Sequence, residues 1–215
     1  MAIDIKLLKI FVEGDGDKVF VRDILKLWYG INLNKDQLKE LIVICKGYNQ
    51  INNQIDEFKQ IGVGEKREAG KNLIIFDADY NGREVNHGFT NKVAYLKGEG
   101  VKLGIDFELF LFPNNHDDGT LETMLESCIN PQHVGIMECW EGFESCVQAK
   151  GRYTIPANKS KMYVYLECLC GNSNSEKEKI KDPNRDFTLT DKWVIDDKTN
   201  AFLGALKNFL NQYFL

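Results

Sequence analysis

The sequence predicts an α/β fold in which a mostly parallel, four-stranded sheet is covered by helices on both faces. Four short apolar runs in the first half have the length of strands and are nearly continuous in hydrophobicity, as expected for strands buried on both faces. Segments with helical apolar spacing separate these runs, and this alternation favours a doubly wound, Rossmann-like, three-layer architecture. Acidic residues follow two of the runs, at the edge where such sheets bind ligands.

The first half of the chain is predicted to alternate between strands and helices. We place the strands at residues 6–12, 41–45, 73–76 and 107–112. The first helix follows Asp15 or Asp17, either of which can cap it, and its apolar side chains recur every four residues from Phe20 onwards. Further helices are predicted at 51–60 and from Phe89 to the glycines at 98 and 100, with a charged surface loop at 62–70.

The second half of the chain is predicted to be mainly helical. Apolar spacing indicates a short helix at 120–127, a longer one through 136–147 and a closing one at 202–213. The segment 161–170 fits either a helix or a strand, and we favour a helix that Gly171 ends. The polar stretch 171–184 predicts a loop, and 187–195 an extended segment. We therefore divide the chain into a core at 1–128 and a helical extension at 129–215 that packs on it as one structural unit.

Composition and charge restrict the class of protein. The chain is 43% hydrophobic and 27% charged over 215 residues, which is typical of a globular domain with a sizeable core. No apolar run approaches the ~20 residues of a membrane span, and no signal peptide is recognisable at the start, so we expect a cytoplasmic protein without a membrane partner. The net charge of −5 argues against a broad electrostatic contact with nucleic acid.

Carboxylates follow the first and third predicted strands. Glu13 and Asp17 flank the glycine-containing turn after the first strand, and Asp77 and Asp79 end the third. Because the carboxyl ends of parallel strands meet at one edge of a sheet, we expect these side chains to lie close together. Alternation along a strand predicts that Asp77 and Asp79 lie on the same side and share one cation or bridge two. Such an oxygen-rich cluster suits a hard divalent cation such as Mg²⁺.

These motifs resemble the TOPRIM domain, which occurs in topoisomerases, bacterial primases, OLD-type nucleases and small nucleases that process ribosomal RNA. The resemblance covers about residues 5–125 and rests on the Glu13-Gly14 turn with Asp17, on the run Phe76-Asp77-Ala78-Asp79 and on the strand order. A further stretch, from Leu111 to Glu122, looks like a family of small uncharacterised bacterial TOPRIM-like proteins.

The resemblance implies Mg²⁺- or Mn²⁺-dependent hydrolysis of phosphodiester bonds in DNA or RNA. OLD-type nucleases carry a Ser-x-x-Glu element late in the domain; here Gly119 stands where the serine would be, so only Glu122 is carried over. The implied metal ligands are Glu13, Asp17, Asp77, Asp79 and Glu122. Glu13 is also implied as a proton-transfer group.

Basic residues and partners are less sharply defined by the resemblance. OLD-type nucleases use a lysine after the late acidic element, and Lys159 and Lys161 are the matching candidates, with the choice between them open. We expect contact with nucleic acid to be weak and mediated by metal. A protein partner and a homo-oligomer both stay open.

Two other functional classes stay open as well. One is a TOPRIM-like metal-binding or interaction module of a multi-component system, without catalysis. The other is a receiver- or phosphatase-like domain in which Asp77 accepts a phosphoryl group; receiver chemistry uses a lysine at a later strand end, where this chain has Pro113. We expect His87 to be an ordinary surface or helix-edge residue, and we keep Trp193 as a candidate for base stacking.

Overall fold

The computed structural model describes residues 5–61 and 70–215, and it confirms the predicted α/β fold. Four parallel strands form a single sheet in the order β2-β1-β3-β4. Their bounds are Leu8–Val12 for β1, Ile42–Ile44 for β2, Lys71–Asp77 for β3 and Glu108–Phe112 for β4. Val12 pairs with both Ile44 and Ile75, so β1, β2 and β3 end close together at one edge of the sheet.

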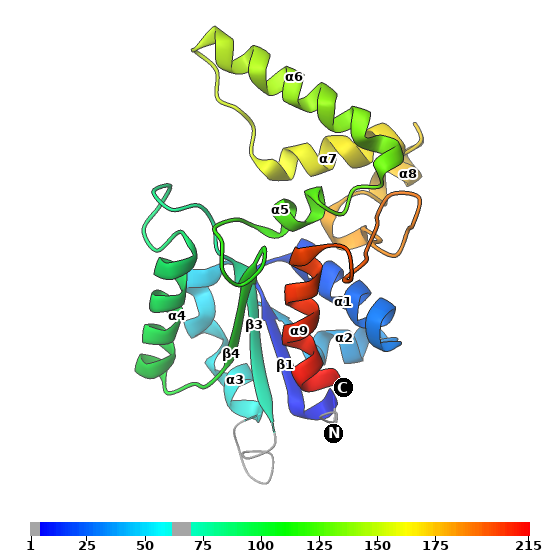
Figure 1. Cartoon of the computed structure of the whole chain (residues 1–215). Helices are drawn as coiled ribbons and strands as arrows, with labels where there is room; N and C mark the ends of the chain where they lie inside the picture. The colour runs from blue at the N-terminus through cyan, green and yellow to red at the C-terminus, as the bar shows by residue number, and fades with distance from the viewer. Residues whose placement is uncertain (1–4, 62–69) are drawn as a thin grey trace.

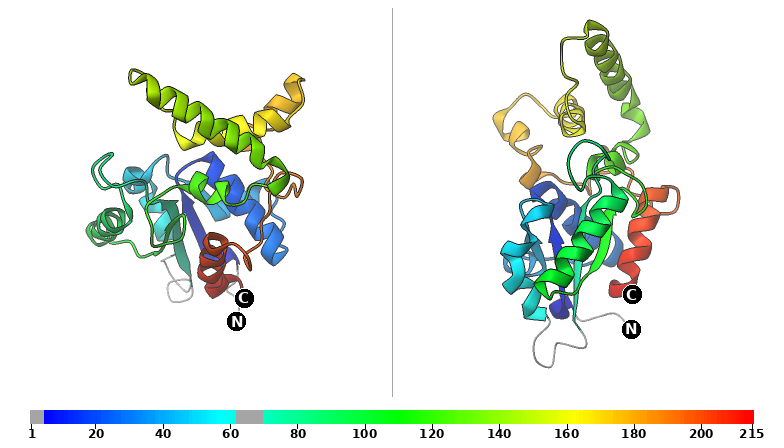
Figure 2. Two further views of the ribbon diagram at one scale, coloured as in Figure 1. Left: turned by 45° about the horizontal axis from the view of Figure 1, so that its top comes forward. Right: turned by 90° about the vertical axis from the view of Figure 1, so that its left-hand side faces the viewer.

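Helices cover both faces of this sheet, as Figures 1 and 2 show. One face packs against α1 (Asp15–Tyr29), α2 (Lys35–Leu41) and α9 (Ala201–Phe214), and the other against α3 (Ile55–Ile61) and α4 (Phe89–Leu103). Neighbouring strand residues point to opposite faces: Ile10 and Val12 belong to the first core cluster, and Phe11 belongs to the second. The three layers follow from strands that are apolar on both faces.

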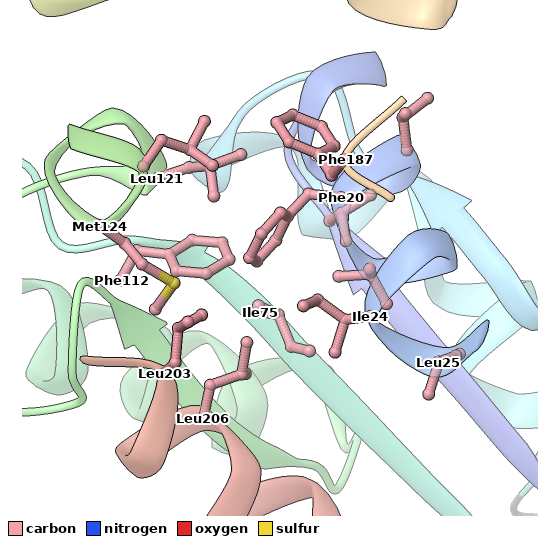
Figure 3. Packing of buried hydrophobic residues seen from close by; sticks show 14 of the residues in the cluster. Phe20, Ile24, Leu25, Ile75, Phe112, Leu121, Met124, Phe187, Leu203 and Leu206 are labelled. Carbon is pink, nitrogen blue, oxygen red and sulfur yellow. The ribbon is translucent and has the colours of Figure 1, made fainter. Parts of the chain in front are cut away.

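The larger core cluster joins segments from both ends of the sequence. The Phe20 ring of α1 makes edge-on contacts with Phe112 of β4 and with Phe187, with centroids 5.9 and 5.3 Å apart. Around them pack side chains of β3, α5 (Leu121–Glu126) and α9, as seen in Figure 3: Ile75, Leu121, Met124, Leu203 and Leu206. The C-terminal segments are therefore part of the same core as the sheet.

Five elements from the second half of the chain gather at the carboxyl edge of the sheet. In Figure 1, α5, α6 (Val134–Lys150) and α7 (Asn158–Leu169) lie above the end of the sheet where the strands finish. After α8 (Asn174–Glu178), the short 3₁₀ helix η5 (Asp182–Asn184) packs against α1. The helical extension thus covers the edge at which the predicted acidic residues lie.

Two of the predicted helix boundaries are wrong. α4 continues through Gly98 and Gly100 and ends at Gly104, whose φ of 64° terminates it. A Cβ on Gly100 would lie 2.9 Å from the Phe107 ring, so this glycine permits close packing rather than ending the helix. The predicted helix at 51–60 consists of a 3₁₀ helix, η2 (Tyr48–Gln54), followed by α3.

Three segments differ from the prediction more strongly. The predicted loop at 171–184 contains α8, which Ser173 and Glu176 begin as a capping box, and η5. The segment 187–195 forms turns with a single bridge between Ile129 and Trp193, and not a strand. Trp193 is buried against Phe187 and is a core residue. The helix α2 was not predicted, and most of the predicted loop at 62–70 lies outside the described residues.

Candidate functional site

Glu13 follows β1 and connects the ends of three strands. Its Oε1 accepts a hydrogen bond from the backbone N–H of Asp77, and its Oε2 accepts one from the N–H of Tyr48, both at 3.1 Å. Asp77 is the last residue of β3, and Tyr48 follows β2 after a turn at Gly47, where φ is 115°. The Glu13 carboxylate is therefore fixed by backbone amides at the carboxyl edge, as its place in the sequence predicted.

Asp17 is oriented by the start of its own helix. It is the third residue of α1, and its Oδ2 accepts the N–H of Gly14 at 2.8 Å. This contact is the half of a capping box in which the N3 side chain bonds back to the residue that precedes the helix. Asp17 is half-buried, whereas Asp15 on the same turn is exposed to solvent.

Asp77 and Glu122 meet through the loop that precedes α5. The Oδ1 of Asp77 accepts the N–H of Leu121 at 2.7 Å, and Glu122 is the next residue, with its Oε2 accepting the Thr120 hydroxyl at 2.9 Å. The loop is held to the segment just after β3 by reciprocal backbone bonds between Asp79 and Gly119. The carboxylate inferred from the loosest part of the resemblance therefore lies beside Asp77.

Gly119 explains the departure from the Ser-x-x-Glu element in physical terms. Its φ is 152°, a conformation that side-chain-bearing residues rarely adopt. A Cβ at this position would lie 3.0 Å from both the Pro113 ring and the Thr123 hydroxyl oxygen. A serine would be strained here, so the loop reaches β3 only with glycine.

Burial and mutual repulsion raise the pKa of three carboxyl groups in this cluster. Burial raises the pKa of Glu13 to about 7, and burial together with the nearby Glu13 raises the pKa of Asp17 to about 7. The pKa of Asp77 is raised well above its usual value by burial and then by Asp17, Glu13 and Glu122. Strongly perturbed carboxyl groups gathered in one place are characteristic of functional sites.

These shifts predict that the protein without metal loses stability as the pH rises. The folded state holds protons that the unfolded chain releases near the usual values of 3.8 and 4.5, so the stabilisation is complete below about pH 4 and is lost by about pH 7. Urea unfolding in a chelator across this interval measures the effect. Asp77→Asn should reduce the slope, and a stability that rises over the same interval would contradict the prediction.

The donor atoms suit a hard divalent cation. Within residues 5–61 and 70–215, the Oδ1 of Asp17, the Oδ2 of Asp77 and the Oε1 of Glu122 accept no hydrogen bond. Carboxylate oxygens are the ligands that Mg²⁺ prefers. In the same part of the chain, no group of three or more His, Cys, Asp or Glu side chains already has the arrangement of a metal site. The chemistry of the donors fits, but binding would require the side chains to turn toward a common point.

Asp79 has different hydrogen-bond and ion-pair partners from Asp77. β3 ends at Asp77, and Asp79 has a φ of 59°, so the alternation of a strand does not extend to it. Its Oδ2 lies 2.6 Å from the Nζ of Lys92 on α4 and 3.4 Å from the Nε2 of His87. The two aspartates therefore have different partners, and both their presentation to one side and the role of Asp79 as a metal ligand stay predictions.

The two candidate lysines have different surroundings. Lys159, at the start of α7, pairs with Asp182 of η5; burial alone would lower the pKa of Lys159, but the Asp182 and Glu122 carboxylates raise it. Lys159 in turn lowers the pKa of Asp17, so its ammonium lies near the acidic cluster. Lys161 is buried and pairs with Glu126 of α5. The geometry therefore favours Lys159.

A cleft borders the site on the side of α6 and α7. It encloses about 900 Å³ between α6 and the segment that leads into α7, and Arg83 and Asn158 are among its lining residues. The Asn158 amide donates to the Tyr80 hydroxyl at 3.2 Å, and this hydroxyl is 2.9 Å from that of Thr123. These contacts dock the start of α7, and with it Lys159, beside the loop that carries Glu122.

Sequence reasoning did not identify two charged groups near the site. Lys92 is fully buried. Its burial could have been predicted from its position, three residues after Phe89 on the apolar face of α4. Arg185 is also buried, and its guanidinium lies 2.9 Å from the Asp182 carboxylate. No sequence pattern indicated this pair, because Asp182 lies in the segment 171–184 that was predicted as a loop and Arg185 follows directly after it. His87, expected at the surface, has only 12% of its side chain exposed.

Comparison with known proteins adds a family but no function. A family model described as a protein of unknown function, DUF3226, matches residues 8–215 and thus includes every candidate site residue. No curated protein and no solved structure matches the chain. No helix in the described part of the chain is long and apolar enough to cross a membrane.

Proposed function

The chain belongs to the DUF3226 family of proteins of unknown function, and for this member we propose metal-dependent hydrolysis of phosphodiester bonds in DNA or RNA. The proposal extends the resemblance to TOPRIM nucleases. One observation carries it: Glu13, Asp17, Asp77 and Glu122 come from three separate parts of the sequence and converge at the carboxyl edge of a parallel sheet, where Asp77 bonds to Glu13 through its N–H and to the residue before Glu122 through its carboxylate. Ligands bind to folds of this class at that edge.

The residues of the cluster would divide the chemistry among them. Mg²⁺ or Mn²⁺ would be held by Asp17, Asp77 and Glu122, each of which has one carboxylate oxygen that accepts no hydrogen bond from the described residues. The metal supplies positive charge to the phosphate oxygens when bound. The side chain of Lys159 is 63% exposed, and its ammonium, now paired with Asp182, would bind a further phosphate oxygen. Glu13, with a pKa of about 7, would take up or release a proton near neutral pH.

The substrate should be one that reaches a recessed, acidic site. With a net charge of −5, the chain has little capacity to bind a duplex by releasing counterions, so affinity for nucleic acid should be weak. Single strands, nicked duplexes and free ends are flexible enough to enter beneath α7. These are the substrate forms that we propose.

The test is cleavage of labelled single-stranded and double-stranded DNA and RNA with Mg²⁺, with Mn²⁺ and with a chelator. We expect product only when a metal is present, because the carboxylates alone repel a phosphate. If none of the four substrates is cut above the chelator background with either metal, the nuclease proposal is overturned.

A non-catalytic interaction module is the second candidate. Two observations favour it: the described residues contain no preformed group of metal ligands, and α6 and α7 form an apolar groove. This groove is lined by Ile136, Trp140 and Phe143 among others, and 46% of Phe143 is exposed. Thermal unfolding with Mn²⁺, read together with the cleavage assay, separates the candidates: a raised midpoint without cleavage favours a metal-binding module, and an unchanged midpoint favours an interaction module without metal.

A further inference from the structure

The helix α6 projects from the molecule and buries little of its apolar surface within the chain. Figures 1 and 2 show it as the outermost helix beyond the carboxyl edge, with α7 between it and the sheet. Two of its 17 residues, Met137 and Trp140, are buried, whereas Val134 is 53% exposed and Phe143 is 46% exposed. Helices of soluble proteins normally pack their apolar side chains against another element, so α6 has a face that remains to be covered.

An apolar groove runs between α6 and α7 at this outer end of the molecule. It encloses about 480 Å³, and its lining includes Ile136, Trp140 and Phe143 from α6 and Val164 from α7. The rings of Trp140 and Phe143 lie against each other, with centroids 5.3 Å apart. Exposed apolar patches of this kind mark surfaces that contact another macromolecule.

Small residues recur along the same side of α6. Gly135, Cys139, Gly142 and Cys146 follow one another at spacings of four and three residues, which places them on one helix face. A Cβ on either glycine would meet nothing within 4 Å, and both cysteine side chains are exposed. The backbone of a second helix can therefore approach this face closely.

The spacing of these residues favours a second copy of the chain as the partner. The point between Gly142 and Phe143 lies near the middle of α6, and Cys139 and Cys146 lie at equal distances on either side of it. A two-fold axis through this point pairs two antiparallel α6 helices, with Cys139 of each copy opposite Cys146 of the other. Each Phe143 ring then lies opposite Gly142 of the other copy, where the open space accommodates it.

The charges of α6 are complementary in the same antiparallel arrangement. Glu138 and Glu141 lie in its N-terminal half, Lys150 is its last residue and Arg152 follows just beyond it, and all four are exposed. Antiparallel pairing brings the acidic half of each helix beside the basic end of the other, whereas parallel pairing would bring like charges together.

We propose that the chain forms a homodimer in which two α6 helices pack antiparallel about a two-fold axis near Gly142. The apolar groove and the small residues form the centre of the interface, and Glu138 of each copy pairs with Lys150 of the other at its rim. This inference goes beyond the proposed function and does not depend on it.

The mass of the protein in solution tests the interface. Sedimentation equilibrium of the wild-type chain should give twice the mass of one chain. Gly142→Arg should give a monomer, because its side chain occupies the space that receives the Phe143 ring. Gly98→Arg on α4 is a matched control that should remain a dimer, since Gly98 is also an exposed helical glycine whose Cβ would meet nothing within 4 Å.

Two results of this experiment would overturn the inference. One is a wild-type chain that stays monomeric throughout the micromolar range, and the other is a Gly142→Arg chain that remains dimeric. Circular dichroism shows whether each variant is folded, and the charge variants described next decide the question if Gly142→Arg is not.

Charge reversal at exposed positions tests the antiparallel direction. Lys150→Glu should raise the dissociation constant of the dimer by about tenfold, because it places glutamate beside Glu138 of the other copy. The double variant Glu138→Lys/Lys150→Glu restores opposite charges and should return the constant to within about threefold of wild type. A double variant that binds no more tightly than Lys150→Glu would overturn the inference.

Disulfide formation tests the register of the two helices. Within one α6 helix Cys139 and Cys146 are about 10 Å apart, too far for a disulfide, so a disulfide between them must join two chains. Diamide takes one hydrogen atom from each thiol, and we expect a covalent dimer that mass spectrometry traces to Cys139 and Cys146. Each of Cys139→Ser and Cys146→Ser should abolish this link, whereas Cys168→Ser on α7 should retain it. Chains linked through other cysteines alone would overturn the inference.

The outcomes remain separate from those of the cleavage assay. A dimer that cuts no nucleic acid would overturn the nuclease proposal alone. A monomer that cuts with Mg²⁺ or Mn²⁺ would overturn the dimer alone.

Discussion

Replacing Asp77 with asparagine should lower the rate of metal-dependent cleavage by about 10²–10³-fold, the usual effect of removing one group that stabilises transition-state charge. The substitution is well matched to this position. The Asp77 Oδ1 accepts the Leu121 N–H at 2.7 Å, and the side-chain carbonyl oxygen of asparagine can keep that hydrogen bond. The side-chain NH₂ group then takes the place of Oδ2, the oxygen proposed to bind the metal. Initial rates on the best substrate measure the effect.

A matched control and a second readout make this result specific. Asp106 is exposed at the opposite end of the sheet, just before β4, and Asp106→Asn should leave the rate unchanged. Metal should stabilise the wild type by about 2.7 kcal/mol at a hundredfold excess over its dissociation constant, and Asp77→Asn should lose that gain. An Asp77→Asn protein that remains both active and stabilised by metal would contradict the assignment of the site.

Phe20→Ala should destabilise the fold by about 3–5 kcal/mol, because the phenylalanine is fully buried and the surrounding side chains relax only partly into the cavity that its ring leaves. Its ring contacts Phe112 of β4 and Phe187 of the C-terminal half at once. For a chain of 215 residues we expect the melting midpoint to fall by roughly 6–20 °C. Calorimetry or urea unfolding measures the loss.

The control lies on the same helix. Leu27 is 43% exposed, so Leu27→Ala should change the free energy of unfolding by no more than about 0.5 kcal/mol. A loss below about 1 kcal/mol for Phe20→Ala would mean that the C-terminal segment does not close the core around this ring.

The spacing of apolar residues along the sequence was sufficient to predict the strands and helices in which such residues recur regularly. β1, β3 and α1 were expected for this reason, and the acidic residues at their ends follow from the parallel topology. α2 was missed because its helical signal is a capping box between Asn34 and Gln37 and not an apolar stripe. Gly100 was misread as a helix end because its reason is a contact with Phe107, which sequence spacing does not reveal.

For the candidate site, the positions of the carboxylates could be predicted from the sequence, but the positions of the basic side chains beside them could not. Glu13, Asp17 and Asp77 follow from strand and helix ends, whereas the direction of Asp79 depends on a left-handed backbone conformation one step beyond the strand. The choice between Lys159 and Lys161 depends on how α7 docks over the sheet, which is a tertiary contact. Short-range rules could not predict it.

The position of α9 has a consequence for biosynthesis. This helix is synthesised long after β1, and its side chains, such as Leu203 and Leu206, cover the face of the sheet to which β1 contributes. Until residue 201 and those after it have emerged, the nascent chain exposes an apolar sheet face and cannot complete its larger core. Cotranslational completion of this core must therefore wait until α9 has emerged, and chains truncated before residue 201 should be targets for chaperones and proteases.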